Sequence, residues 1–209
     1  MRLILASASP RRREILDLLG LEYTVCPAGS EIPLPVSCRL EDGVTQIAQG
    51  KAQEVARTHP ADIVIGADTV VAVERDGAGT VPGAPRDERV LGKPRDRQEA
   101  REMLRLLQGN THRVVTAVWV CTPQGGAGFA SHTLVRFYPM TEREIDDYVA
   151  TGEPLDKAGA YGIQGRGLRY IREIGGDFYT VMGLPAAGLW RLLPQVLPPA
   201  VKIEDFLKK

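Results

Sequence analysis

Three consecutive arginines follow a short apolar segment and a serine-rich turn near the N-terminus. Residues 3–6 predict a buried strand, and residues 7–10, with Ser before Pro, predict the start of a helix. Arg11, Arg12 and Arg13 then lie in the first turn, where the helix dipole and free backbone N–H groups already present positive charge. A bound polyphosphate would compensate the positive charge of the arginines and that of the helix start. An arginine run on the solvated face of a helix is the alternative, and these residues alone leave both interpretations open.

An aspartate, Asp68, follows an apolar segment that predicts a buried strand over residues 62–67. A carboxylate at the end of a strand can hold a divalent cation or take a proton from water. An aspartate in a turn that hydrogen-bonds nearby backbone is the alternative. Lys51, in a helix predicted over residues 40–57, and Lys93 could each reach a phosphate, although most lysines are simply solvated.

The segment 152–165 is rich in glycine and polar residues and too irregular for a single helix or strand. Loops of this kind often carry specificity. The Gln164 side chain offers one acceptor and two donors, enough to contact the edge of a nucleobase, whereas a surface amide in a turn is the alternative. The P-loop spacing and the dinucleotide-binding GxGxxG spacing are both absent. The three histidines lack the spacing of a metal site or a catalytic triad.

The elements that must position these residues alternate between helices and strands along the chain. The pattern predicts further strands at 22–25, 70–73, 114–121 and 133–137, and further helices at 96–107, 141–149 and 185–194. The last two strands are predicted to pair through the glycine-rich segment 124–128, and residues 74–90 are predicted to form a long exposed loop. This order favours an α/β fold with a mixed, partly antiparallel sheet.

The composition excludes several functional classes. The 209 residues are 44% apolar and 25% charged, which predicts one globular domain over residues 1–209. Because 26 basic residues balance 26 acidic ones, no global field favours DNA, RNA or an anionic membrane. The three cysteines predict neither a disulfide framework nor a zinc site, and no signal or membrane segment is evident, so we expect a cytoplasmic protein.

Taken together, three segments resemble the Maf family. They are LASASPRR at residues 5–12, GADTVV at 66–71 and GEPLDKAGAYGIQG at 152–165, and a further GLP at 183–185 extends the resemblance over almost the whole chain. The resemblance implies a Maf/Ham1-like twisted sheet flanked by helices, with two lobes and a cleft between them. It also implies hydrolysis of a nucleoside triphosphate to the monophosphate and pyrophosphate with a divalent cation, Mg²⁺ or Mn²⁺.

The same resemblance implies roles for individual residues. Asp68 matches the proposed proton acceptor of the family and a cation ligand, and Glu31 matches a second cation ligand. The residues expected to bind the substrate are Ser7, Arg11, Arg12, Lys51, Thr69, Lys93 and Gln164. The 74–90 loop is longer than is usual in the family, and Gln49-Gly50 departs from the helix-favouring residues expected before Lys51.

Thr69 and Gln164 also indicate the branch of the family, because they match the members that act on dTTP and UTP. A modified pyrimidine such as 5-methyl-UTP fits the same branch. The alternatives are a 7-methyl-GTP pyrophosphatase, which the resemblance disfavours at Thr69 and Gln164, and a non-catalytic nucleotide-binding regulator of cell division. The resemblance further implies a homodimer.

Overall fold

The computed structural model describes residues 1–30, 32–35, 38–74 and 88–208. These residues form two compact units. Unit 1 contains residues 1–68, 116–131 and 182–209, and unit 2 contains residues 69–115 and 132–181. We expected a single domain over residues 1–209, and that expectation stays a prediction. Each unit is described separately below.

The strands form one mixed sheet in the order β2-β1-β3-β5-β6-β7, and β4 pairs with β3. Their bounds are β1 Leu3–Leu5, β2 Thr24–Val25, β3 Ile63–Glu74, β4 Glu88–Leu91, β5 Thr111–Thr122, β6 Gly125–Phe137 and β7 Ile171–Gly175. β1 runs parallel to β2 and β3, whereas the pairs β3–β4 and β6–β7 are antiparallel. The predicted mixed, partly antiparallel α/β fold is confirmed.

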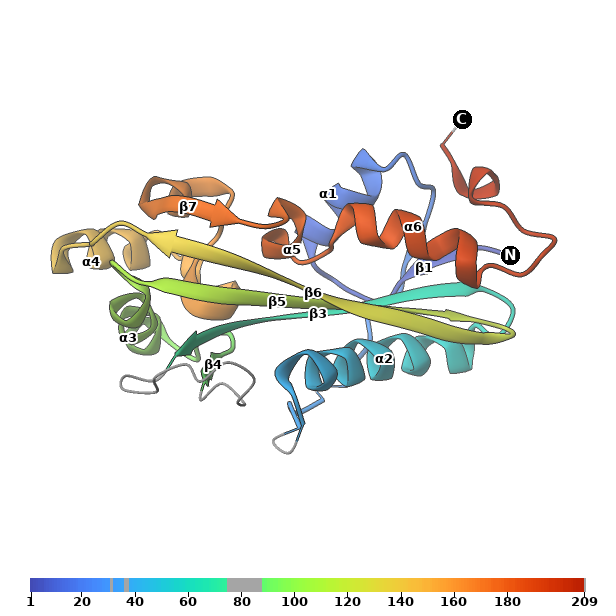
Figure 1. Ribbon diagram of the computed structural model, residues 1–209, viewed down its shortest axis with the longest axis horizontal. Helices are drawn as coiled ribbons and strands as arrows, with labels where there is room; N and C mark the ends of the chain where they lie inside the picture. Colours follow the sequence, from blue (N-terminus) through green and yellow to red (C-terminus); the bar gives the residue numbers. More distant parts are fainter. Residues whose placement is uncertain (31, 36–37, 75–87, 209) are drawn as a thin grey trace. The chain divides into compact units, whose positions relative to one another are not determined.

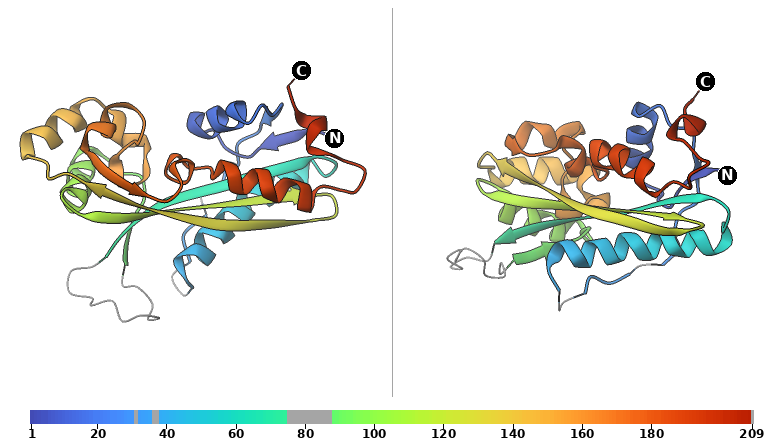
Figure 2. Two further views of the ribbon diagram at one scale, coloured as in Figure 1. Left: turned by 45° about the horizontal axis from the view of Figure 1, so that its top comes forward. Right: turned by 45° about the vertical axis from the view of Figure 1, so that its right-hand side comes forward.

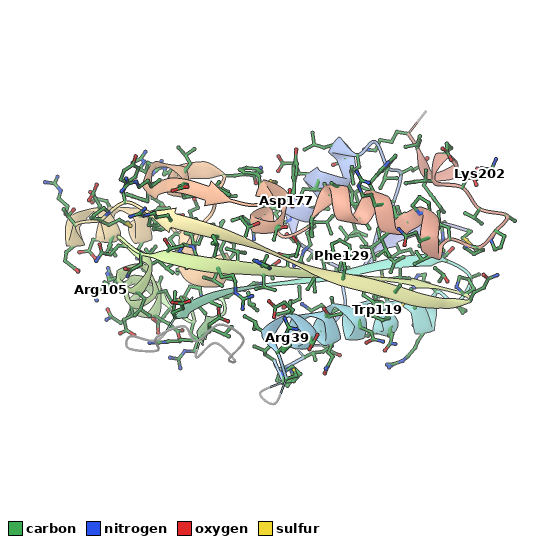
Figure 3. The ribbon with its side chains drawn as sticks, in the orientation of Figure 1. Arg39, Arg105, Trp119, Phe129, Asp177 and Lys202 are labelled. Atoms are coloured by element: carbon green, nitrogen blue, oxygen red, sulfur yellow. The ribbon has the colours of Figure 1, made fainter. Side chains whose placement is uncertain are left out.

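In unit 1, helices cover both faces of the sheet. Helix α2 (Leu40–Thr58) lies along one face, while α1 (Pro10–Leu18) and α6 (Ala186–Val196) lie on the other (Figures 1 and 2). Trp119 of β5 points to the α2 side and Phe129 of β6 to the α6 side (Figure 3). Gly188 lets α6 approach the Phe129 ring, because a Cβ atom there would lie 2.4 Å from it.

In unit 2, α3 (Arg97–Leu107) and α4 (Glu142–Ala150) lie together and share two surface ion pairs. Both helices are capped at their N-termini: the Asp96 side chain accepts from the Glu99 N–H, and Thr141 forms a capping box with Glu144. The core beneath them is apolar and aromatic. The chain then forms the short 3₁₀ helices η1 (Glu153–Asp156), η2 (Ala158–Ala160) and η3 (Gly165–Tyr170), followed after β7 by α5 (Phe178–Met182).

The structure corrects several sequence expectations. β3 runs unbroken from Ile63 to Glu74, so Asp68 lies within a strand and not after its end, and ladder pairing overrides the polar interruption. The glycine-rich segment 124–128 is mostly strand, since Gly126 and Gly128 make room for the Trp119 side chain. Strand β7 and helix α5 were not expected, because their short segments carry weak periodicity.

The predicted loop over residues 74–90 is shorter than expected, because both of its ends belong to strands. Glu74 belongs to β3, and residues 88–90 belong to β4, while residues 75–87 lie outside the described part of the chain. Helix α2 continues through Gly50, whose Cα faces the Ile32 side chain. Among the described residues, no helix combines the length and apolar character needed to cross a bilayer.

Candidate active site

Asp68 and Lys51 meet in unit 1. The Lys51 ammonium donates to the Asp68 carboxylate, with Nζ 2.5 Å from Oδ1. Both side chains are mostly buried, with 22% and 18% of their surface exposed. Within the run of buried residues in β3, only Asp68 and Thr69 are partly exposed before the strand ends. A carboxylate and an ammonium therefore lie at the surface of an otherwise apolar strand.

Close packing between α2 and β3 creates this pair. Gly66 and Asp68 are two residues apart in a strand, so they point to the same face of the sheet. A Cβ atom at Gly66 would lie 2.3 Å from the Ala48 carbonyl oxygen and 2.9 Å from the Ala52 Cβ. Glycine thus lets α2 lie directly against β3, and this approach places Lys51, one helical position before Ala52, against Asp68.

Arg12 is held beside this pair by two hydrogen bonds. Its Nη1 donates to Ser7 Oγ at 2.9 Å, and its Nε donates to the Gly183 carbonyl at 2.8 Å. Burial lowers the pKa of Arg12, and the charge of Asp68 opposes that shift. The guanidinium remains charged, because arginine starts from a very high pKa. Arg12 is therefore a fixed cation whose charge interacts with that of Asp68.

The first turn of α1 carries no acidic residue, and the Ser9 side chain does not cap it. The backbone N–H groups at the helix start and the arginines together make this end of α1 electropositive. Arg11 is half-buried like Arg12, whereas Arg13 is exposed. Ser7 is expected to bind substrate, and in this structure its hydroxyl accepts from Arg12 and from the Ser9 N–H. Ser7 thereby orients Arg12.

The remaining predicted residues belong to unit 2. Thr69 is half-buried in β3, Lys93 is exposed two residues after the end of β4, and Gln164 is half-buried just before η3. Gly159 in the segment 152–165 donates its N–H to the Gly92 carbonyl at 3.0 Å, next to Lys93. The structure therefore ties the Gln164 segment to the Lys93 segment within this unit.

Sequence reasoning missed two residues that organise these groups. The Gly183 carbonyl anchors Arg12, and the Glu153 carboxylate accepts three hydrogen bonds around the Gln164 turn. For Glu153, the spacing of Gly162, Gly165 and Gly167 was an available signal, because closely spaced glycines indicate close backbone approach. The role of Gly183 depends on a contact far along the chain and had no local signal.

The donor set for a divalent cation is small. The described residues contain no cluster of three or more histidine, cysteine or acidic side chains, and Glu31 lies outside them. Mg²⁺, however, needs only one or two carboxylates when substrate phosphates complete its shell. Asp68 supplies one hard oxygen donor of that kind, so the residues present fit a cation that is shared with a phosphate.

A cavity of about 590 Å³ lies elsewhere in unit 1, between α2 and the turn that joins β5 to β6. Gln49, Gln53 and Trp119 are among its lining residues, and none of the predicted site residues is.

Comparison with known proteins identifies the family. The profile of a family described as Maf-like protein matches residues 2–196. A dTTP/UTP pyrophosphatase of Bacillus cytotoxicus is 45% identical over 194 residues, which cover 93% of this chain and 95% of that protein. A protein of the same name from Bacillus pumilus is 43% identical over 192 residues, covering 92% and 95% of the two chains.

Solved structures are more distant. The Ham1 protein of Staphylococcus aureus is 15% identical, with a TM-score of 0.45, covering 93% of this chain and 98% of that one. A nucleoside-triphosphatase / dITP/XTP pyrophosphatase of Mycobacterium abscessus is 14% identical, with a TM-score of 0.42, covering 96% and 100%. Similarity this low does not bear on function.

Proposed function

Because the chain belongs to the Maf family, we propose that it hydrolyses dTTP and UTP to the nucleoside monophosphate and pyrophosphate. The observation that carries this proposal is the 43–45% identity to dTTP/UTP pyrophosphatases over more than nine-tenths of both chains. The cluster of Arg12, Lys51 and Asp68 in unit 1 supports it, because this cluster offers the charges that phosphoryl chemistry requires.

In the proposed reaction, the triphosphate lies at the start of α1. Arg11 and Arg12 bind it there together with the backbone N–H groups of the helix start, and Lys51 binds further phosphate oxygens. The family resemblance assigns a phosphate contact to Lys93 as well. The fixed Arg12 guanidinium needs little reorganisation as negative charge moves toward the leaving group, so it favours the transition state. Pyrophosphate is a good leaving group when such cations surround it.

Asp68 orients the attacking water and accepts its proton. The water oxygen forms a bond to the α phosphorus, the bond from that phosphorus to the bridging oxygen breaks, and pyrophosphate leaves. Lys51 fixes the orientation of the carboxylate through its contact with Oδ1. Asp68, with Glu31 as second ligand, would also hold Mg²⁺ or Mn²⁺, which supplies positive charge to the phosphate oxygens when bound.

Selectivity for pyrimidines is proposed to come from Gln164 and Thr69, which match the dTTP and UTP branch of the family. A modified pyrimidine such as 5-methyl-UTP fits this branch as well. We infer no nucleic-acid or membrane partner, since the formal net charge is zero. A homodimer stays a prediction, which light scattering of the purified protein checks.

The test is a panel of nucleoside triphosphates incubated with the purified protein and Mg²⁺ or Mn²⁺. We expect pyrophosphate release to be fastest with dTTP, UTP or 5-methyl-UTP and to stop when EDTA removes the cation. Release that is fastest with 7-methyl-GTP would assign the other branch. Nucleotide binding without pyrophosphate release would overturn the proposal in favour of a non-catalytic regulator.

A further inference from the structure

The carboxylate of Glu153 lies at the centre of the irregular segment that carries Gln164. Its Oε2 accepts the backbone N–H of Arg166 at 2.9 Å. Its Oε1 accepts the Tyr148 hydroxyl at 2.9 Å and the backbone N–H of Gly167 at 3.2 Å. Three donors thus converge on one side chain, and two of them are backbone N–H groups two and three residues after Gln164.

The residues before Gln164 are tied to the same centre. The backbone N–H of Gly162 donates to the Tyr148 hydroxyl oxygen at 3.1 Å, in a buried position. Tyr148 therefore accepts from one side of the Gln164 turn and donates to Glu153, which accepts from the other side. Gln164 lies between these two attachments, so the position of its backbone is set by the pair Tyr148 and Glu153.

Close packing explains why glycines occupy this turn. Gly165 has φ +80°, and a Cβ atom there would lie 2.9 Å from Glu153 Oε2. At Gly167 a Cβ atom would lie 2.3 Å from the Gly162 carbonyl oxygen and 2.6 Å from the Tyr148 hydroxyl. The backbone wraps the carboxylate and the hydroxyl too closely for larger residues. The sequence GIQGRG at 162–167 is the local signature of this wrap.

Glu153 is also linked to the segment of unit 2 that carries Lys93. The Lys157 ammonium donates to the Glu153 backbone carbonyl at 2.7 Å. Gly159, two residues further, donates its N–H to the carbonyl of Gly92, the residue before Lys93. A segment fixed at Glu153 therefore contacts the chain next to the lysine that we propose to bind phosphate.

Glu153 is ionised in this arrangement at neutral pH. Burial by itself would raise the pKa of its carboxyl group, but the N–H of Arg166, the Tyr148 hydroxyl and the N–H of Gly167 lower it, as does the nearby Lys157 charge. The net result is a pKa below the ordinary value. Charge-assisted hydrogen bonds are stronger than neutral ones, so the wrap is a stiff support and not a loose turn.

We propose that Glu153 is a positioning residue for base selection: it holds the turn 162–167 in the one geometry that presents Gln164 to the pyrimidine. The inference deepens the proposed function and depends on it. Recognition by hydrogen bonds requires placement within a fraction of an ångström, and a side chain on an irregular segment needs such a support. Glu153 itself does not contact the reacting atoms.

The test replaces Glu153 by glutamine, which keeps the shape but offers one acceptor oxygen and turns an N–H₂ group toward a backbone donor. We expect the ratio of kcat/KM for UTP to that for GTP to fall about tenfold, mainly through a higher KM for UTP. The matched control is Glu142→Gln, which removes an exposed carboxylate of the same unit that pairs with Arg105, and it should leave the ratio unchanged.

A double-mutant cycle separates positioning from a general structural effect. If Glu153 acts through Gln164, then Glu153→Gln should not lower the ratio further in a Gln164→Ala background. An equal loss in both backgrounds, or an unchanged ratio in folded Glu153→Gln protein, would overturn the inference. If Glu153→Gln does not fold, Tyr148→Phe removes the hydroxyl link to Gly162 with almost no change of shape and should lower the ratio in the same way.

Failure of this inference is distinguishable from failure of the proposed function. Wild-type protein that releases no pyrophosphate from UTP or dTTP removes the proposed function. Wild-type protein that does so, with a base preference that Glu153→Gln and Tyr148→Phe leave intact, removes only the positioning role.

Discussion

Units 1 and 2 hold their proposed substrate-binding residues by different means. In unit 1, Arg12, Lys51 and Asp68 project from regular helices and a strand and are fixed by side-chain contacts. In unit 2, Gln164 lies in an irregular segment and is fixed by backbone N–H groups that converge on Glu153. In unit 1 these charged residues thus lie on regular elements, whereas in unit 2 Gln164, which we propose contacts the base, lies in a turn with its own internal support.

The difference has a physical reason. A triphosphate has the same charge whichever base it carries, so its binding groups can be built once into regular elements. Base recognition is proposed to depend on the Gln164 amide together with Thr69, and a turn can reposition that amide without disturbing the sheet. The comparison predicts that changes in unit 1 act on turnover and changes in the Gln164 segment act on selectivity.

The largest effect is expected at Asp68. Asp68→Asn removes the proton acceptor and should lower kcat for dTTP by about 10³-fold or more, with the order of preference among nucleotides unchanged. Pyrophosphate release measures the rate. Asp62→Asn is the matched control, because Asp62 is a carboxylate paired with Arg2 just before the same strand, and its loss should leave kcat near the wild-type value. Wild-type turnover by Asp68→Asn would refute the proposed mechanism.

Gln164→Glu should have a smaller effect and a different one. The substitution replaces the donor amide by a negative charge, so it should lower kcat/KM for UTP and dTTP about 100-fold relative to GTP. Initial rates across a nucleotide panel give the ratio. Exposed Gln195→Glu on α6 is the control and should change nothing. Unchanged relative rates for Gln164→Glu would show that the two units are not divided by role.

The smallest effect is on stability, at His112 in the core of unit 2. Its Nε2 contacts the Tyr161 hydroxyl at 2.8 Å, and burial lowers the pKa of His112 from 6.5 to about 3. As pH falls below 6.5, the unfolded chain binds a proton that the folded chain does not. The free energy of unfolding should therefore drop by about 2 kcal/mol between pH 7 and pH 5 from this residue alone.

His112→Phe should remove that drop, although it also leaves the Tyr161 hydroxyl without its partner and lowers stability at pH 7. Urea unfolding at the two pH values measures the difference. Exposed His132→Phe serves as the control and should retain the wild-type pH dependence. An equal pH dependence in wild-type and His112→Phe protein would mean that the histidine is not held neutral in the core.

Most regular elements could be predicted from the sequence. Apolar periodicity and capping residues located α1, α2, α3, α4 and α6 to within a few residues, because burial of one face leaves a regular pattern. Asp68 was wrongly placed after a strand, since a polar pair inside a strand resembles a strand end. β7 and α5 were missed because segments of five residues carry almost no periodic signal.

The sequence by itself determined which residues could do chemistry: the arginines at a helix start, an aspartate within an apolar segment and a polar residue in a glycine-rich turn. Only the tertiary structure decided that Lys51 meets Asp68, that the Gly183 carbonyl holds Arg12 and that Glu153 supports the Gln164 turn. Local patterns record burial and conformation, whereas these contacts depend on how closely distant segments pack. That packing follows from the whole fold, and at Gly66 and Gly167 it depends on the absence of a single Cβ atom.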